Sequence, residues 1–137
     1  MNSKQIQLVQ TTWRQVQPVA DDAAALFYTR LFDVDPSLKP MFRGDMKEQG
    51  RKLMAMITFA VNGLSRLDSL MPGLRALGQR HAGYGVRDEH YDTVASALIW
   101  TLEKGLGAAF TREVKAAWVA AYTALSSTMK DAAKVAA

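Results

Sequence analysis

Apolar residues recur every three or four positions along most of this chain, the spacing that collects them on one face of an α-helix. The first such run follows the candidate caps Asn2 and Ser3 and is broken by Pro18. Its apolar members are Ile6, Val9, Trp13 and Val16. The pattern then predicts a second helix over about residues 21–32 and a short proline-led turn over residues 36–42.

Four more helices are predicted in the remainder of the chain. One covers about residues 47–64, and its apolar face carries Gln49, Leu53, Met56, Ile57 and Ala60. A shorter one starts near residue 68 and carries Leu70, Leu74, Leu77 and His81 before two glycines. The next carries Tyr91, Val94, Leu98 and Leu102, and the last, capped by Thr111, carries Val114, Trp118, Tyr122, Leu125 and Met129. The sequence therefore predicts an all-α protein of about seven helices, folded as a single domain over residues 1–137.

The composition supports one globular domain and argues against a membrane span, a signal peptide and a nucleic-acid partner. With 137 residues, 49% hydrophobic and 22% charged, the chain has the size and apolar content of one ordinary globular domain. No apolar run reaches the roughly 18 residues of a membrane-spanning helix, and the first residues lack the apolar core of a signal peptide. We therefore expect a cytoplasmic protein without a membrane span. The net charge is +4, but the basic residues are scattered, so we expect no nucleic-acid partner.

Few residue types are available for metal or nucleophile chemistry. The chain has no cysteine, which excludes disulfides, thiolate nucleophiles, iron–sulfur clusters and zinc ribbons. Only two histidines occur, His81 and His90, so a histidine-rich metal site is excluded as well. Any metal has to be held by a histidine, a carboxylate or a cofactor.

Three polar residues on apolar faces are candidates for a binding site. Taken singly, His81 is more typical of a packed boundary residue, Gln49 of a loop contact, and Tyr28 of a core residue with a satisfied hydroxyl. Together the three residues favour a binding site more strongly, because Gln49 and His81 lie on two different helices that could sandwich a flat apolar ligand. Tyr28 could then place its hydroxyl beside Gln49, and Phe42 could close one side.

Four segments carry a resemblance to the globin family, specifically to bacterial single-domain haemoglobins and the haem domain of flavohaemoglobins. LFYTRLF at 26–32 resembles the family's second helix, and the spacing from Pro36 to Phe42 resembles its short third helix. QGRKLM at 49–54 is similar to its distal helix, and RHAGYGVRDEHY at 80–91 to its proximal segment. The resemblance covers essentially the whole chain and implies a globin fold around one haem b, the iron protoporphyrin IX.

The resemblance also implies a role for individual residues. His81 corresponds to the proximal iron ligand, and Tyr28, Gln49 and Leu53 correspond to the distal pocket that faces a bound gas. The other residues expected to contact the haem are Phe42, Lys52, Leu53, Leu77 and Tyr91. Lys52, like Arg51, Arg80 and Arg87, is near enough in sequence to pair with a haem propionate, although an ordinary solvated charge is an equal alternative. His90 matches nothing functional and is expected to be a surface or packing residue.

Two departures from the flavohaemoglobin pattern bear on activity. Ala133 stands where those proteins carry a glutamate that hydrogen-bonds the proximal imidazole, so we expect Nδ1–H of His81 to donate instead to a backbone carbonyl, that of Leu77. No flavin or nicotinamide domain follows residue 137, so electrons are expected from a separate reductase.

Three functions remain open. The first is reversible binding, storage or delivery of O2, with NO and CO as further ligands. The second is enzymatic removal of NO by an NO dioxygenase activity with a separate reductase. The third is a haem-based gas sensor or interaction module.

Overall fold

The computed structural model describes residues 1–42 and 44–136, and in these residues it contains six α-helices, four short 3-10 helices and no strand. The α-helices are α1 (Ser3–Val16), α2 (Ala20–Val34), α3 (Met46–Asn62), α4 (Leu67–Gly83), α5 (Asp88–Leu106) and α6 (Arg112–Ala136). The 3-10 helices are η1 (Gln17–Val19), η2 (Pro36–Met41), η3 (Leu64–Arg66) and η4 (Gly107–Ala109). The all-α prediction is confirmed, and the seventh predicted element corresponds to η2.

The helices α1, α3 and α6 begin where a capping side chain satisfies a free backbone N–H group. Asn2 accepts a hydrogen bond from the backbone N–H of Gln5 at 2.8 Å, and the Gln5 side chain accepts one from the Asn2 N–H at 3.2 Å. Asp45 accepts from Lys47 N–H at 2.9 Å at the start of α3, and Thr111 accepts from the N–H of Val114 at 3.2 Å at the start of α6. The predicted cap Thr111 is therefore confirmed, and of the candidates Asn2 and Ser3 the cap is Asn2, since Ser3 is the first residue of α1.

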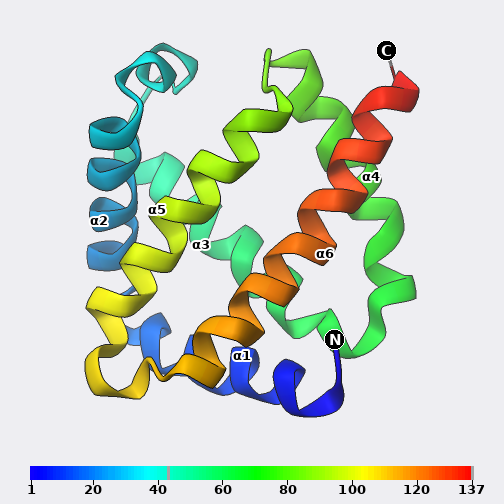
Figure 1. Ribbon diagram of the computed structural model, residues 1–137. Coiled ribbons are helices and arrows are strands. Elements are labelled where there is room, and N and C mark those ends of the chain that lie inside the picture. The colour runs from blue at the N-terminus through cyan, green and yellow to red at the C-terminus, as the bar shows by residue number, and fades with distance from the viewer. Residues whose placement is uncertain (43, 137) are drawn as a thin grey trace.

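The most extensive helix contacts are those of α4 with α6, α2 with α5, α1 with α6, and α2 with α3. Figure 1 shows α5 and α6 in front of α3, with α2 on one side and α4 on the other. Trp13 and Trp118 pack edge to face at the centre, with ring centroids 5.9 Å apart. Their indole N–H groups donate to Thr58 Oγ1 and Thr12 Oγ1, each at 2.9 Å, so these polar groups are satisfied inside the core. None of the described helices combines the length and apolar content needed to cross a membrane.

A second apolar cluster fills the contact between α4 and α6. Its buried members are Leu70, Leu74, Tyr91 and Met129. The two helices approach so closely that a Cβ atom added at Gly78 would lie 2.7 Å from the Cα atom of Met129. Only glycine fits this crossing, and the crossing sets the position of the next turn of α4, which carries His81.

Replacing Gly78 by Ala is expected to lower the free energy of unfolding by about 1–3 kcal/mol, because α4 and α6 have to separate to admit the methyl group. Urea unfolding followed by circular dichroism measures the change. The matched control is Gly73→Ala on the same helix, where the nearest atom to the new Cβ is 3.9 Å away on the Phe59 ring. This control is expected to gain roughly 0.5–1 kcal/mol, the usual effect of removing a glycine from a helix. Equal stability of Gly78→Ala and the parent would contradict the close approach.

Candidate functional site

Tyr28, on α2, lies against the start of α3 as the sequence predicted. Its side chain is buried, and its O–H donates to the backbone carbonyl of Gln49 at 3.4 Å. The distance is long for an O–H···O bond, so this contact holds the hydroxyl weakly and leaves it free to turn toward another acceptor. The helices meet closely here because Gly50 is buried against Ala24, whose Cβ would be 3.0 Å from a Cβ at Gly50.

Burial fixes the protonation state of this tyrosine. Loss of solvation raises the pKa of Tyr28 to about 12, because the phenolate form would be a poorly solvated charge. The hydroxyl is therefore neutral near pH 7 and is a hydrogen-bond donor. Gln49 is half-buried in the first turn of α3, and Leu53, one turn later, is half-buried against the main core.

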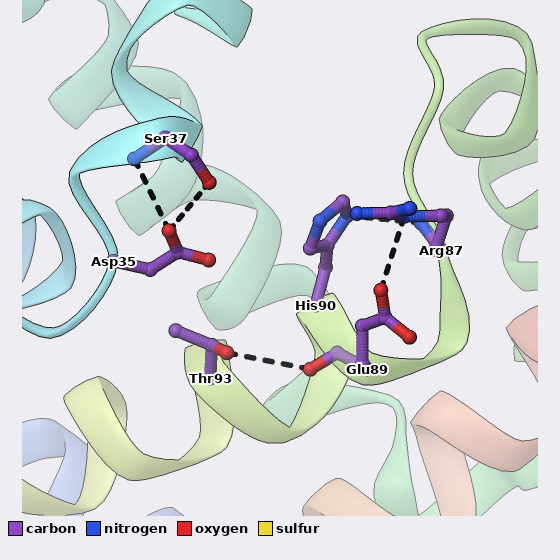
Figure 2. A network of polar contacts seen from close by, with 6 residues as sticks. All are labelled: Asp35, Ser37, Arg87, Glu89, His90 and Thr93. Atoms are coloured by element: carbon purple, nitrogen blue, oxygen red, sulfur yellow. Dashed lines mark hydrogen bonds and ion pairs between the residues drawn. The ribbon is translucent and has the colours of Figure 1, made fainter.

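Phe42 is held beside Tyr28 by the turn that precedes it. Asp35 accepts a hydrogen bond from the backbone N–H of Ser37 at 3.1 Å, which starts η2 after the end of α2 (Figure 2). The Phe42 ring then packs edge-on against Tyr28 and Phe32, with centroids 5.3 and 5.5 Å away. The ring is half-buried, so part of it remains available to a ligand.

His81, near the end of α4, has its ring orientation fixed by one hydrogen bond. Its Nδ1 lies 2.9 Å from the carbonyl oxygen of Leu77, one turn earlier, as predicted. A carbonyl can only accept, so Nδ1 carries the proton and Nε2 keeps its lone pair. Burial lowers the pKa of His81, as does the positive charge of Arg80, while the bond to Leu77 opposes these effects. The neutral imidazole is thus the favoured form, which is the form that ligates a metal.

The turn after α4 holds the backbone of this histidine, and sequence reasoning missed the residues involved. The His81 carbonyl accepts from the N–H groups of Tyr84 at 3.1 Å and Val86 at 3.0 Å. Val86 also packs on the α4–α6 apolar cluster. The available signal was the pair Gly83 and Gly85, a spacing typical of a turn that ends a helix.

Tyr91, on α5, lies beside the His81 ring. The two rings are 26° from parallel with centroids 6.4 Å apart, and Tyr122 O–H donates to the Tyr91 carbonyl at 2.6 Å. Tyr91 is buried, yet its own hydroxyl has no hydrogen-bond partner among the described residues. Buried hydroxyls are usually hydrogen-bonded, so this one is available to a further partner.

The charged residues considered for haem propionates are all on the surface. Lys52 is exposed on α3. Arg51 lies 3.8 Å from Glu48, and Arg87 lies 3.1 Å from Glu89 (Figure 2), both in exposed ion pairs that contribute little to stability. His90 is buried rather than exposed, and its Nδ1 accepts from the Arg87 backbone N–H at 2.9 Å at the start of α5. Of its two expected roles, packing residue is therefore the one observed.

The candidate residues form two groups on different helix pairs. Tyr28, Phe42, Gln49 and Leu53 come from α2, α3 and the segment between them, and α3 packs most closely on α2 and α1. Leu77, His81 and Tyr91 come from α4 and α5, and α4 packs most closely on α6. The two groups together could hold a haem, since they supply one neutral imidazole nitrogen, an orphaned hydroxyl, aromatic and aliphatic side chains, and a hydroxyl and an amide.

Comparison with known proteins assigns the family. The globin family model matches residues 25–129. The neuroglobin of Tetraodon nigroviridis is 27% identical over 94% of this chain and 90% of its own length. The flavohemoprotein of Xylella fastidiosa is 32% identical over 76% of this chain and 27% of that protein, so the match covers only a part of it.

Two solved structures confirm the predicted globin fold. A bacterial globin from Campylobacter jejuni superposes with a TM-score of 0.84 at 24% identity, covering 98% of this chain and 97% of that one. An engineered carbene transferase, made from a putative nitric oxide dioxygenase of Rhodothermus marinus, superposes with a TM-score of 0.88 at 22% identity and covers 98% and 94%. The chain belongs to the globin family, whose members bind haem.

Proposed function

We propose that this chain holds one haem b through Nε2 of His81 and binds O2 reversibly on the side of Tyr28 and Gln49. The observation that carries the proposal is the bond from His81 Nδ1 to the Leu77 carbonyl, which leaves Nε2 unprotonated and fixes the direction of the ring. A carbonyl oxygen is a weaker hydrogen-bond acceptor than a carboxylate. It therefore leaves the proton on Nδ1 and the imidazole neutral. A neutral proximal ligand suits gas binding better than peroxidase-like chemistry.

The other residues of the site each have a separate task in this proposal. When bound, the haem supplies a ferrous iron with one position open to a diatomic gas, O2 first and also NO or CO. Phe42, Leu53, Leu77 and Tyr91 would hold its apolar faces, and Lys52 would pair with one of its propionates. Tyr28 O–H and the Gln49 amide would donate hydrogen bonds to O2 held on this side. We place this function in the cytoplasm.

The absorption spectrum of the purified protein tests the proposal directly. We expect a Soret band, and in the dithionite-reduced, desalted protein we expect repeated cycles of O2 and argon to interconvert two stable spectra. This result would support reversible oxygen binding, for which the neutral Tyr28 hydroxyl would be a hydrogen-bond donor. Absence of a Soret band after expression with excess haem would contradict the haem proposal. Complete oxidation on the first exposure to O2 would contradict reversible binding.

NO dioxygenase activity is the second candidate, favoured by similarity to a flavohemoprotein and to a protein derived from a putative nitric oxide dioxygenase. The O2-loaded ferrous protein and NO would give nitrate and the ferric protein, so each further turnover needs one electron. The globin match over residues 25–129 accounts for a haem-binding domain, and in this proposal a separate reductase supplies that electron.

With the isolated chain we expect one fast NO-consuming turnover per haem and then arrest in the ferric state. Stopped-flow absorption and nitrate analysis measure both. A control with an added ferredoxin–reductase pair and NADPH is expected to restore continuous turnover. Continuous nitrate production with NADH alone, in protein free of contaminating reductase, would contradict the carrier function and favour the enzyme.

A further inference from the structure

A surface groove of about 270 Å³ lies between α5 and α6, outside the haem site. Its lining includes the apolar residues Ile99 and Val119, and Asp92 and Lys130 line it on opposite helices. The two helices run antiparallel on either side of η4, and Figure 1 shows both on the same face of the molecule. The start of α5 therefore lies beside the end of α6.

The charges along this groove are separated by helix. One exposed face of α6 carries a stripe of residues spaced three or four positions apart. The stripe is basic at both ends and has small residues at its centre. Its members are Arg112, Ala116, Val119, Thr123, Ser127, Lys130 and Lys134. On α5, the stripe that borders the groove has acidic ends and a small apolar centre. Its members are Asp88, Asp92, Ala95, Ile99 and Glu103. One wall is thus acidic and the other basic.

The charges along this groove form no ion pair with one another in the described part of the chain. Among the residues that the structure describes, Asp88, Asp92 and Glu103 have no cation within ion-pair distance. Lys130 makes a cation–π contact with the Tyr91 ring at 5.5 Å and no ion pair. Val119 is 45% exposed at the centre of the α6 stripe. An apolar centre flanked by unpaired charges of opposite sign is typical of a contact surface with a complementary partner.

A second copy of the same chain carries that complementary surface. If a two-fold axis runs along the groove, α5 of each chain lies over α6 of its partner. The rotation does not shift residues along the groove, so residues at the same level of the two helices meet. Asp92 then faces the partner's Lys130, and Glu103 faces the partner's Arg112. A two-fold axis across the groove would instead place the acidic ends of the two α5 helices against each other, which the charges disfavour.

We propose that the α5–α6 face is the interface of a homodimer whose two-fold axis runs along the groove. The small residues at the centre of both stripes let the four helices approach closely, and Val119 and Ile99 supply the apolar contact. Exposed ion pairs contribute little each, so the dimer is reversible and weakens as salt screens the charges.

The first test is sedimentation of the haem-loaded protein over a range of concentrations at low and high salt. We expect a monomer–dimer equilibrium that Val119→Arg weakens by at least about ten-fold, since the new side chain places a charge in the apolar centre. Val34→Arg is the matched control, because Val34 is equally exposed, at 44%, but lies at the end of α2. A parent protein that stays monomeric at millimolar concentration would overturn the proposal. Equal effects of the two arginine variants would overturn it too.

The second test distinguishes the two arrangements by charge reversal. Asp92→Lys and Lys130→Glu are each expected to weaken self-association, because each places like charges opposite each other across the proposed two-fold axis. A mixture of the two variants is expected to form heterodimers at least about ten-fold more tightly than either variant forms homodimers. In the heterodimer both ion pairs are restored, one as in the parent and the other with its two charges exchanged. Sedimentation of the mixture, with one variant carrying a fluorophore, measures this. A mixture that associates no better than the separate variants would overturn the proposed axis.

Discussion

Replacement of His81 by Ala is expected to abolish stable haem ligation. No second imidazole is available, since the other histidine of the chain, His90, is buried at the start of α5 with its Nδ1 held by the Arg87 N–H. The apolar walls remain, so free haem is expected to bind loosely and to be lost on desalting. Haem content per chain and the ferrous Soret spectrum measure the loss. Added imidazole is expected to restore the spectrum, because it can occupy the space left by the side chain.

The control for this variant is His90→Gln, which removes the other imidazole. It is expected to keep the haem and to lose at most about 1 kcal/mol of stability, because the substitution changes a helix cap and not the proximal side. If His81→Ala kept the Soret and CO-binding spectra of the parent, His81 would not be the ligand. Loss of haem in both variants alike would point to the fold rather than to ligation.

The helical pattern predicted most of the fold because each signal is local. The caps Asn2 and Thr111, the break at Pro18 and the apolar faces depend on residues within one or two turns, and the caps and the break are observed. The predicted apolar face of α3 is only partly correct, because Met56 is 37% exposed while Met54 and Val61 are buried instead. The crossing of α4 and α6 at Gly78 could not be predicted in this way. Periodicity shows which face of a helix is buried but not which helix covers it or how closely.

The site shows the same division between local and long-range contacts. The bond from His81 to the Leu77 carbonyl joins residues four apart on one helix, so it could be predicted from spacing. The hydroxyl of Tyr28 was expected beside Gln49, and the structure places it on the backbone carbonyl of that residue, a contact between two helices. The orphaned hydroxyl of Tyr91 depends on packing from α4, α5 and α6, so no local pattern predicted it.

Removal of the distal donors is expected to speed O2 release. Tyr28→Phe deletes one hydroxyl and keeps the ring that packs against Phe42, and Gln49→Leu replaces the amide by an apolar group of similar size. A hydrogen bond to a charged acceptor contributes about 1.5–3 kcal/mol, so each variant is expected to release O2 on the order of ten- to a hundred-fold faster. CO dissociation is expected to change less, because bound CO carries less negative charge than bound O2. Stopped-flow displacement measures both rates.

Tyr84→Phe is the matched control for the tyrosine, because Tyr84 is 69% exposed and lies in the turn after α4. The same atom is removed there, outside the distal side, so the O2 off-rate is expected to stay that of the parent. The raised pKa of Tyr28 gives a second expected result. Since that pKa is about 12, the phenol is neutral from pH 6 to 9, and the parent's O2 off-rate is expected not to change over this range. Parent-like O2 off-rates in both Tyr28→Phe and Gln49→Leu would show that neither side chain donates to the ligand. In that case the parent's O2 off-rate would be set by the apolar walls, which hinder O2 and CO to a similar extent because they act on size and not on charge.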